Sequence, residues 1–200
     1  MAMKEQNKSG QVYGYITGRI RQLDENTPWA KAMLAKLRRA AGKSPGESPE
    51  VWEVTLGGMP DELSGGNHDV SYAEQAVYTA LTLYALHRQG GNTSMHEGKG
   101  LSLGGGAARL RNEKTESGIQ RRFDAVITAK DLTELSYHAR GLIQLMRASN
   151  TSNTPVRLDY AQLAVDLFRY QFPEQRSTIH LKWGRDFYKN KIVEVNNKDE

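Results

Sequence analysis

The chain has no cysteine among its 200 residues. This absence excludes disulfide bonds, thiolate metal sites and cysteine nucleophiles, and it suits a reducing cytosol. Hydrophobic residues make up only 38% of the sequence, and no apolar run approaches the length that a membrane helix requires. The polar N-terminal segment MAMKEQNKSGQ also lacks the apolar core of a signal peptide. We therefore expect a cytoplasmic protein without a membrane partner.

The sequence motifs of catalysis and cofactor binding are missing as well. Gly100 follows Lys99 where a phosphate-binding loop requires Ser or Thr, and no predicted strand precedes this segment. The GGG run at 104–106 lacks the spacing of a dinucleotide-binding fingerprint. There is no HExxH motif and no nucleophile elbow, and the histidines are scattered along the chain. We expect no enzymatic activity, no cofactor and no metal site.

Positive charge is only slightly in excess, but it is unevenly distributed. The formal net charge is +4, whereas residues 19–43 alone contain seven Lys or Arg and two acidic residues. Arg38-Arg39 and Arg121-Arg122 are adjacent pairs, and Arg is preferred over Lys where a planar group must grip phosphate. From the residues alone, this pattern leaves two interpretations open: a surface that binds nucleic acid, or one that contacts another protein.

The apolar residues recur at helical spacing from Thr27 onward, and no segment shows the two-residue alternation of a strand. We therefore predict an all-α helical bundle, with Trp183 and Phe187 facing its core. Pro173 is expected to end one helix and begin the last one. Helix-start signals occur at Thr27-Pro28, at Ser48-Pro49, at Ser71 with Glu74, and at Asp159.

Glycine is concentrated in one segment, because seven of the 19 glycines lie within residues 90–106. Such a stretch predicts a long loop, with helix resuming at about Ala107. A second linker is predicted over residues 149–156. The bundle is either single or divided near residue 100 into two small helical halves, 1–100 and 101–190, followed by a mobile tail over 191–200.

Several motifs follow one another in an order that resembles the CasB family, the small subunit of the type I-E Cascade CRISPR surveillance complex. The resemblance extends from about Trp29 to Tyr188. The motifs that carry it are HRQG (87–90), SMH (94–96), LSLG (101–104), RRF (121–123), LDYAQLAVDLFRYQ (158–171) and WGRDFY (183–188).

The resemblance implies an all-helical, non-catalytic protein that helps to hold an R-loop during antiviral defence. Its implied partners are the guide RNA, the target DNA with its displaced single strand, the other Cascade subunits, and a second copy of the chain. The nucleic-acid-binding residues carried over by motif are Arg38, Arg39, Lys99, Arg109, Arg111, Arg121, Arg122 and Arg140.

Arg121 and Arg122 allow a specific structural expectation. They lie between Ile119 and Phe123, on a predicted helix whose apolar side must face the core. At least one of the two arginines should therefore project into solvent. Two alternatives to nucleic-acid binding within Cascade remain: a helical adaptor with basic faces, and a helix-turn-helix DNA-binding regulator, which requires a tight turn before a base-reading helix.

Overall fold

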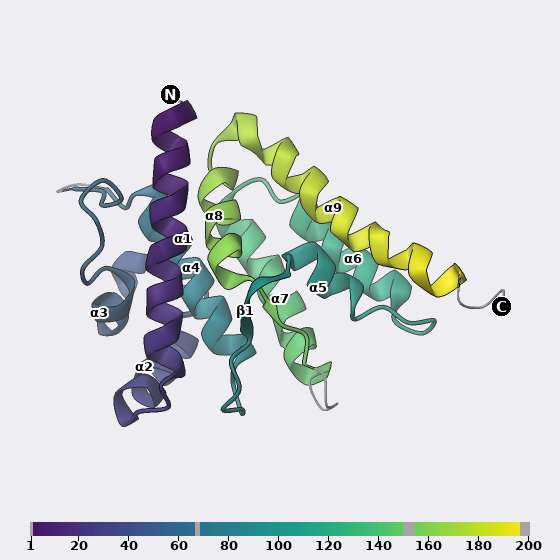
Figure 1. The fold of residues 1–200 in the computed structure, drawn as a ribbon, viewed down its shortest axis with the longest axis horizontal. Helices are drawn as coiled ribbons and strands as arrows, with labels where there is room; N and C mark the ends of the chain where they lie inside the picture. The colour runs from purple at the N-terminus through teal and green to yellow at the C-terminus, as the bar shows by residue number, and fades with distance from the viewer. Residues whose placement is uncertain (1, 67–68, 150–154, 197–200) are drawn as a thin grey trace.

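Helices follow one another along almost the whole chain in the computed structural model, so the predicted all-α class is confirmed (Figure 1). The structure describes residues 2–66, 69–149 and 155–196, with the backbone alone for residues 2–6 and 190–196. The α-helices are α1 (Ala2–Asp24), α2 (Pro28–Ala40), α3 (Trp52–Thr55), α4 (Tyr72–His87), α5 (Leu103–Ala108), α6 (Glu116–Ile127), α7 (Leu132–Ser149), α8 (Tyr160–Tyr170) and α9 (Pro173–Asn196). Two short 3-10 turns, η1 (Pro45–Glu47) and η2 (Pro49–Val51), precede α3.

Three of the predicted helix starts are confirmed by their hydrogen bonds, whereas Ser48-Pro49 begins the 3-10 turn η2 without a side-chain cap. The Thr27 side chain accepts from the backbone N–H of Ala30 at the start of α2, and Ser71 and Glu74 form a capping box on α4. The Asp159 carboxylate accepts from the N–H of Gln162 and so caps α8. Each cap satisfies a backbone donor that the first turn of a helix leaves without a partner.

The core is built around α4, which packs against α1, α2, α7 and α8. All residues from Ala73 to His87 except Glu74 and Gln75 are buried, so α4 has apolar contacts on every side. Helix α8 in turn lies between α1 and α9 (Figure 1). Trp183 and Phe187 on α9 are fully buried, as their one-turn spacing predicts. Because α8 contacts α1 and α4, elements before and after residue 100 share this core.

Helix α1 has no counterpart in the sequence prediction, whose first helix begins after Thr27. Val12, Ile16, Ile20 and Leu23 are spaced by four and three residues and are all buried. The helical signal is weakened by Gly10, Gly14 and Gly18, since glycine disfavours helix by about 1 kcal/mol relative to alanine. Contact with α8 supplies the stability that the local sequence does not.

The prediction of one long loop over residues 90–106 is wrong. A short strand, β1 (His96–Leu101), lies within it and bridges to Leu158 in parallel orientation. The N–H of Leu158 donates to the carbonyl of Met95 at 3.1 Å, and the N–H of Asp159 donates to that of Leu101 at 3.0 Å. The partner segment lies more than fifty residues further along the chain, so local sequence gives no sign of the pairing.

The GGG run is helical rather than part of a loop. Helix α5 starts at Leu103, four residues before the predicted position, and Ser102 caps it by accepting from the N–H of Gly105. Gly104 packs directly on α9, where a Cβ atom would collide with the backbone of Trp183. The absence of a side chain at Gly104 thus permits close contact between two helices.

The division into residues 1–100 and 101–190 stays a prediction. Most of the predicted linker, residues 150–154, lies outside the described residues, as do the last four residues of the predicted tail. Residues 191–196 of that tail belong to α9.

Candidate nucleic-acid interface

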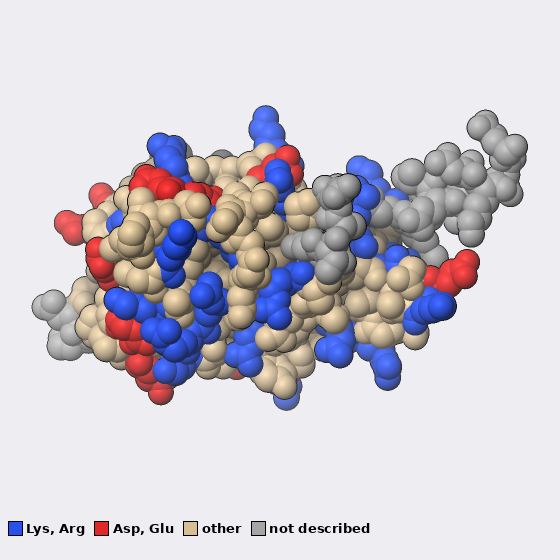
Figure 2. All heavy atoms as spheres, turned by 90° about the horizontal axis from the view of Figure 1, so that it is seen from below, with Lys and Arg blue, Asp and Glu red and all other residues tan. Residues whose placement is uncertain are grey.

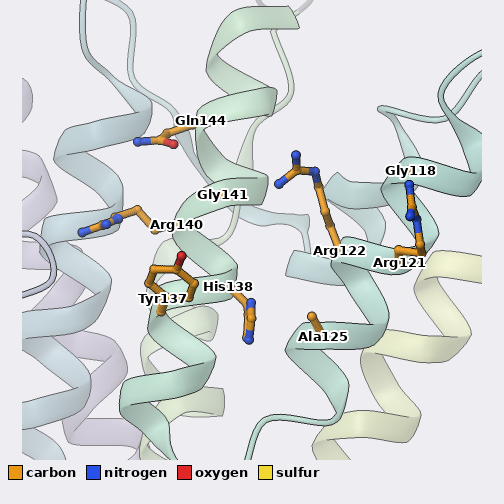
Figure 3. A pocket seen from close by; sticks show the side chains of 9 residues that line it. All are labelled: Gly118, Arg121, Arg122, Ala125, Tyr137, His138, Arg140, Gly141 and Gln144. Carbon is orange, nitrogen blue, oxygen red and sulfur yellow. The ribbon is translucent and has the colours of Figure 1, made fainter.

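A hollow of about 490 Å³ lies between α6 and α7. Three of the predicted arginines line it, and no carboxylate does. Figure 3 shows the side chains of the two helices around this space. We call it the α6–α7 hollow; its lining is Gly118, Arg121, Arg122, Ala125, Tyr137, His138, Arg140, Gly141 and Gln144.

The pattern of buried residues on α6 explains why its arginines reach the hollow. Ile119, Phe123 and Val126 are buried, which leaves Arg121 and Arg122 on the other side of the helix. Both arginines are exposed, so the expectation that at least one would project into solvent is confirmed. Within the described part of the chain, neither side chain forms an ion pair or a hydrogen bond. Their charges are therefore available to a ligand.

The arginines of the hollow differ in direction (Figure 3). Arg122 extends from α6 toward α7, where a Cβ at Gly141 would lie 3.7 Å from its Nη1 atom. Arg140 extends to the opposite side of α7 and donates a 3.0 Å hydrogen bond to the carbonyl of Ala41, just after α2. Arg140 thus ties α7 to the end of α2, and its guanidinium lies on the side of α7 away from Arg122.

A second hollow, of about 360 Å³, adjoins the first and is called here the α2–α7 hollow. Tyr137 and Arg140 line both, and Lys43 adds a cation on the α2 side, close to the acidic Glu47. Arg38 and Arg39 lie in the last turn of α2, a few residues before Gly42 and Lys43, which line this hollow.

The two arginines of α2 differ in their surroundings. Arg39 is exposed, whereas Arg38 is partly buried. Burial and the neighbouring charge of Arg39 lower the pKa of Arg38. Figure 2 shows the underside of the molecule, where Lys and Arg form a dense group at the lower left, bordered by acidic side chains, and smaller groups along the lower edge.

Lys99 and Arg109 meet at a third hollow, of about 580 Å³, together with Arg157. Lys99 is held in the left-handed region, with φ of 61°, and its N–H donates to the Asp159 carboxylate at 2.9 Å. Few residues other than glycine adopt this conformation, so the bond to Asp159 fixes the course of β1 at Lys99. Both Lys99 and Arg109 are exposed.

Arg111 is placed differently from the other predicted residues. Its guanidinium pairs with Glu116 at 2.9 Å, donates to the carbonyl of Phe187 at 3.0 Å, and lies 4.8 Å from the centre of the Phe187 ring. Only 10% of the side chain is exposed. Because these internal contacts engage its guanidinium, Arg111 is left out of the interface that we propose below.

Sequence reasoning missed Tyr137, His138, Lys43 and Arg157, all of which line the hollows. Tyr137 carried a usable signal, because it is an aromatic residue outside the apolar stripe of its helix. Arg157 carried none, since its place beside Lys99 depends on the pairing of β1 with Leu158.

The described residues contain neither a metal-binding cluster nor a membrane-spanning helix. No three His, Cys, Asp or Glu side chains there are grouped so that they could share a metal ion. In the same residues, no helix combines the length and the hydropathy needed to cross a membrane.

The family described as CRISPR-associated protein Cse2 matches residues 33–188. The chain belongs to the Cse2 (CasB) family. The resemblance seen in its sequence motifs is thereby confirmed. Among curated proteins, none is detectably similar to the chain.

Several solved structures share this fold. CasB from Thermobifida fusca is 28% identical with a TM-score of 0.72, and the match covers 89% of this chain and 98% of that one. A chain of a CRISPR RNA-guided surveillance complex is 16% identical with a TM-score of 0.69, covering 94% and 99%. A Cse2-family protein from Thermus thermophilus is 22% identical with a TM-score of 0.63, covering 90% and 97%.

Proposed function

We propose that this Cse2-family protein is a non-catalytic subunit of a cytoplasmic CRISPR Cascade complex and holds nucleic acid on its basic hollows. The observation that carries the proposal is the pair Arg121 and Arg122, two exposed cations that have no partner among the described residues and that line a hollow without carboxylates. The family supports the Cascade assignment, as does a fold shared with a chain of an RNA-guided surveillance complex.

The proposed contacts are with the phosphate backbone. Such contacts position a nucleic acid and add affinity without reading its sequence. In an R-loop, the heteroduplex that forms is about as stable as the DNA duplex that it replaces, so backbone contacts by protein can tip the exchange. The proposed ligands are accordingly the guide RNA–target DNA hybrid and the displaced single strand.

Arg121, Arg122 and Arg140 form the centre of the proposed interface, because they line one hollow. Arg38 and Arg39 extend it along α2, and Lys99 and Arg109 form a separate group at the third hollow. The other Cascade subunits and a second copy of this chain are proposed as its protein partners.

The test is a salt titration of binding to single-stranded DNA by the isolated protein and by the Arg121→Ala/Arg122→Ala double variant. Each neutralised phosphate releases counterions, so the affinity of the wild type should fall steeply with salt. The double variant should bind more weakly to all sequences alike, with a salt slope reduced by about one unit per lost phosphate contact.

The matched control is Arg185→Ala/Lys189→Ala, which removes the same charge from exposed positions on α9 that line none of the three hollows. This control should retain most of the affinity and the salt slope. If both double variants lose binding equally, net charge is responsible and the hollow is not a site. If the arginine variant binds as the wild type does but fails to assemble with Cascade subunits, the adaptor alternative is favoured.

A further inference from the structure

Tyr137 is the most exposed large hydrophobic side chain among the described residues, at 67%. Its ring lies edge-on to that of His138, with the ring centroids 5.3 Å apart, so this contact leaves most of the side chain uncovered. The Tyr137 hydroxyl makes no hydrogen bond within the described part of the chain. Its ring therefore presents free aromatic surface to solvent.

The position of this ring links it to the basic residues. Tyr137 lines both the α6–α7 hollow and the α2–α7 hollow, so it stands where the two adjoin. Arg121 and Arg122 lie on one side of it and Lys43 on the other. The guanidinium of Arg140, on the same face of α7, is 6.0 Å from the centre of the ring.

An aromatic face between cations matches the chemistry of a single-stranded polynucleotide, in which bases alternate with phosphates. Proteins that hold single strands combine a basic groove with aromatic rings on which bases stack, and this stacking tolerates any base. A duplex keeps its bases stacked on one another and offers no free face. A ring at this place would therefore favour single strands over duplexes.

We infer that Tyr137 is a stacking platform for an unpaired base of a single strand whose phosphates bind the surrounding cations. The inference rests on the proposed function and narrows it to a ligand with unstacked bases. The hydroxyl contributes nothing to this role, because the ring face alone makes the contact.

The test compares three ligands: an oligothymidylate, an abasic deoxyribose-phosphate oligomer of the same length, and a DNA duplex. Wild type should bind the oligothymidylate about five- to a hundredfold more tightly than the abasic oligomer, the range expected for one stacked base. Tyr137→Ala should lose this preference while binding the abasic oligomer as wild type does. Tyr137→Phe should keep the preference, because the ring remains.

The arginine variant separates this inference from the proposed function. Arg121→Ala/Arg122→Ala should weaken binding of the oligothymidylate and of the abasic oligomer together, since both carry the same phosphates. If that variant weakens binding but Tyr137→Ala leaves the preference intact, the stacking role is overturned and the proposed function stands. If neither variant changes binding, the proposed function at this surface fails as well.

Two other outcomes would also overturn the inference. One is a wild type that does not prefer the oligothymidylate to the abasic oligomer. The other is a Tyr137→Ala protein that keeps the preference but no longer assembles with Cascade subunits, which would make Tyr137 a protein contact. Should Tyr137→Ala fail to fold, as judged by circular dichroism, Tyr137→Leu tests the same point because it keeps apolar bulk and removes the ring.

Discussion

His87 is a buried histidine whose surroundings favour its neutral form. Its Nδ1 atom lies 3.0 Å from the Tyr160 hydroxyl, and its Nε2 atom is buried without a hydrogen-bond partner among the described residues. Burial lowers the pKa of His87 from 6.5 to about 4. Protonation in the folded state would place an uncompensated charge beside Tyr160, within the core.

This pKa predicts acid sensitivity. As pH falls below 6.5, His87 becomes protonated in the unfolded chain, whereas in the folded chain it stays neutral down to about pH 4. The unfolded state is therefore favoured by proton binding, and stability is lost between these two pH values. The free energy of unfolding should fall by about 2 kcal/mol between pH 7 and pH 5 because of His87 alone. Urea titrations at both pH values should show a smaller decrease in the free energy of unfolding for His87→Gln than for the wild type. An equal loss in variant and wild type would mean that other groups cause it.

Asp166 is a buried carboxylate that joins α8 to α9. Its oxygens accept from Lys182 Nζ at 2.7 and 2.8 Å, from the Trp183 indole at 2.8 Å, and from Gln162 Nε2 at 2.9 Å. All of these partners donate, so the site suits an acceptor with two oxygens.

Asp166→Asn should therefore destabilise the protein by about 3 kcal/mol, because it removes the charge and turns one acceptor into a donor that faces other donors. Lys182→Met should cost less, about 1–2 kcal/mol, because the lysine side chain is 38% exposed and the buried Asp166 carboxylate keeps the Trp183 and Gln162 donors. Chemical unfolding of the two variants measures the difference. A larger loss from Lys182→Met would contradict this account.

Helices α5 and α9 are in contact through Gly104. A Cβ there would collide with the backbone of Trp183, which cannot move aside as a flexible side chain can. The neighbouring Gly105 has room, because its Cβ would lie 3.5 Å from Leu101 Cδ2, an ordinary contact distance. The two glycines thus form a matched pair for testing how closely the helices must approach.

Gly104→Ala should destabilise by about 1–3 kcal/mol, the usual cost of overpacking a core. Gly105→Ala should be neutral or stabilise by about 0.5–1 kcal/mol, because alanine favours helix over glycine. Thermal unfolding followed by circular dichroism compares them directly. If both substitutions are equally harmless, α5 can shift away from α9 and the close contact is not required.

Some helices could be predicted because their signals are local. Ser71 with Glu74 and Asp159 mark starts that need no knowledge of the rest of the chain. The helix of the GGG run and strand β1 could not be predicted, since Gly104 acquires its role from Trp183 and β1 from Leu158.

The candidate site follows the same division between local and distant causes. The outward direction of Arg121 and Arg122 follows from the apolar stripe of α6 alone. Their meeting with Tyr137 depends on how α6 packs against α7. Arg109 and Arg111 are indistinguishable in the sequence, because contact with Phe187 on α9 is what engages Arg111 inside the protein.

The basic surface as a whole draws on distant parts of the chain. The α2–α7 hollow combines Lys43 with Arg140, and Arg140 is fixed by its bond to the carbonyl of Ala41. The third hollow combines Lys99 of β1 with Arg109. A surface built in this way holds its charges at fixed separations only while the helices stay packed, so the proposed binding should depend on the stability of the fold.

The last prediction concerns the assembled complex. In a reconstituted Cascade, Arg121→Ala/Arg122→Ala should still assemble, because both side chains are exposed and alanine favours helix. It should nevertheless form R-loops that dissociate faster, since backbone contacts that tip a near-balanced exchange are lost. The R-loop dissociation rate of the variant complex should be measured at two salt concentrations and compared with that of the wild type. The difference should be larger at the lower salt concentration, where phosphate contacts are strongest.

The Arg185→Ala/Lys189→Ala variant provides the control for R-loops too, because it carries the same loss of charge away from the hollows. If the R-loops of the arginine variant are as long-lived as those of the wild type, Arg121 and Arg122 are solvent-exposed residues that do not contact nucleic acid. An arginine variant that unfolds or does not assemble would give them a structural role instead. Shortened R-loop lifetime with intact assembly is the result that requires the two guanidinium groups to act on nucleic acid.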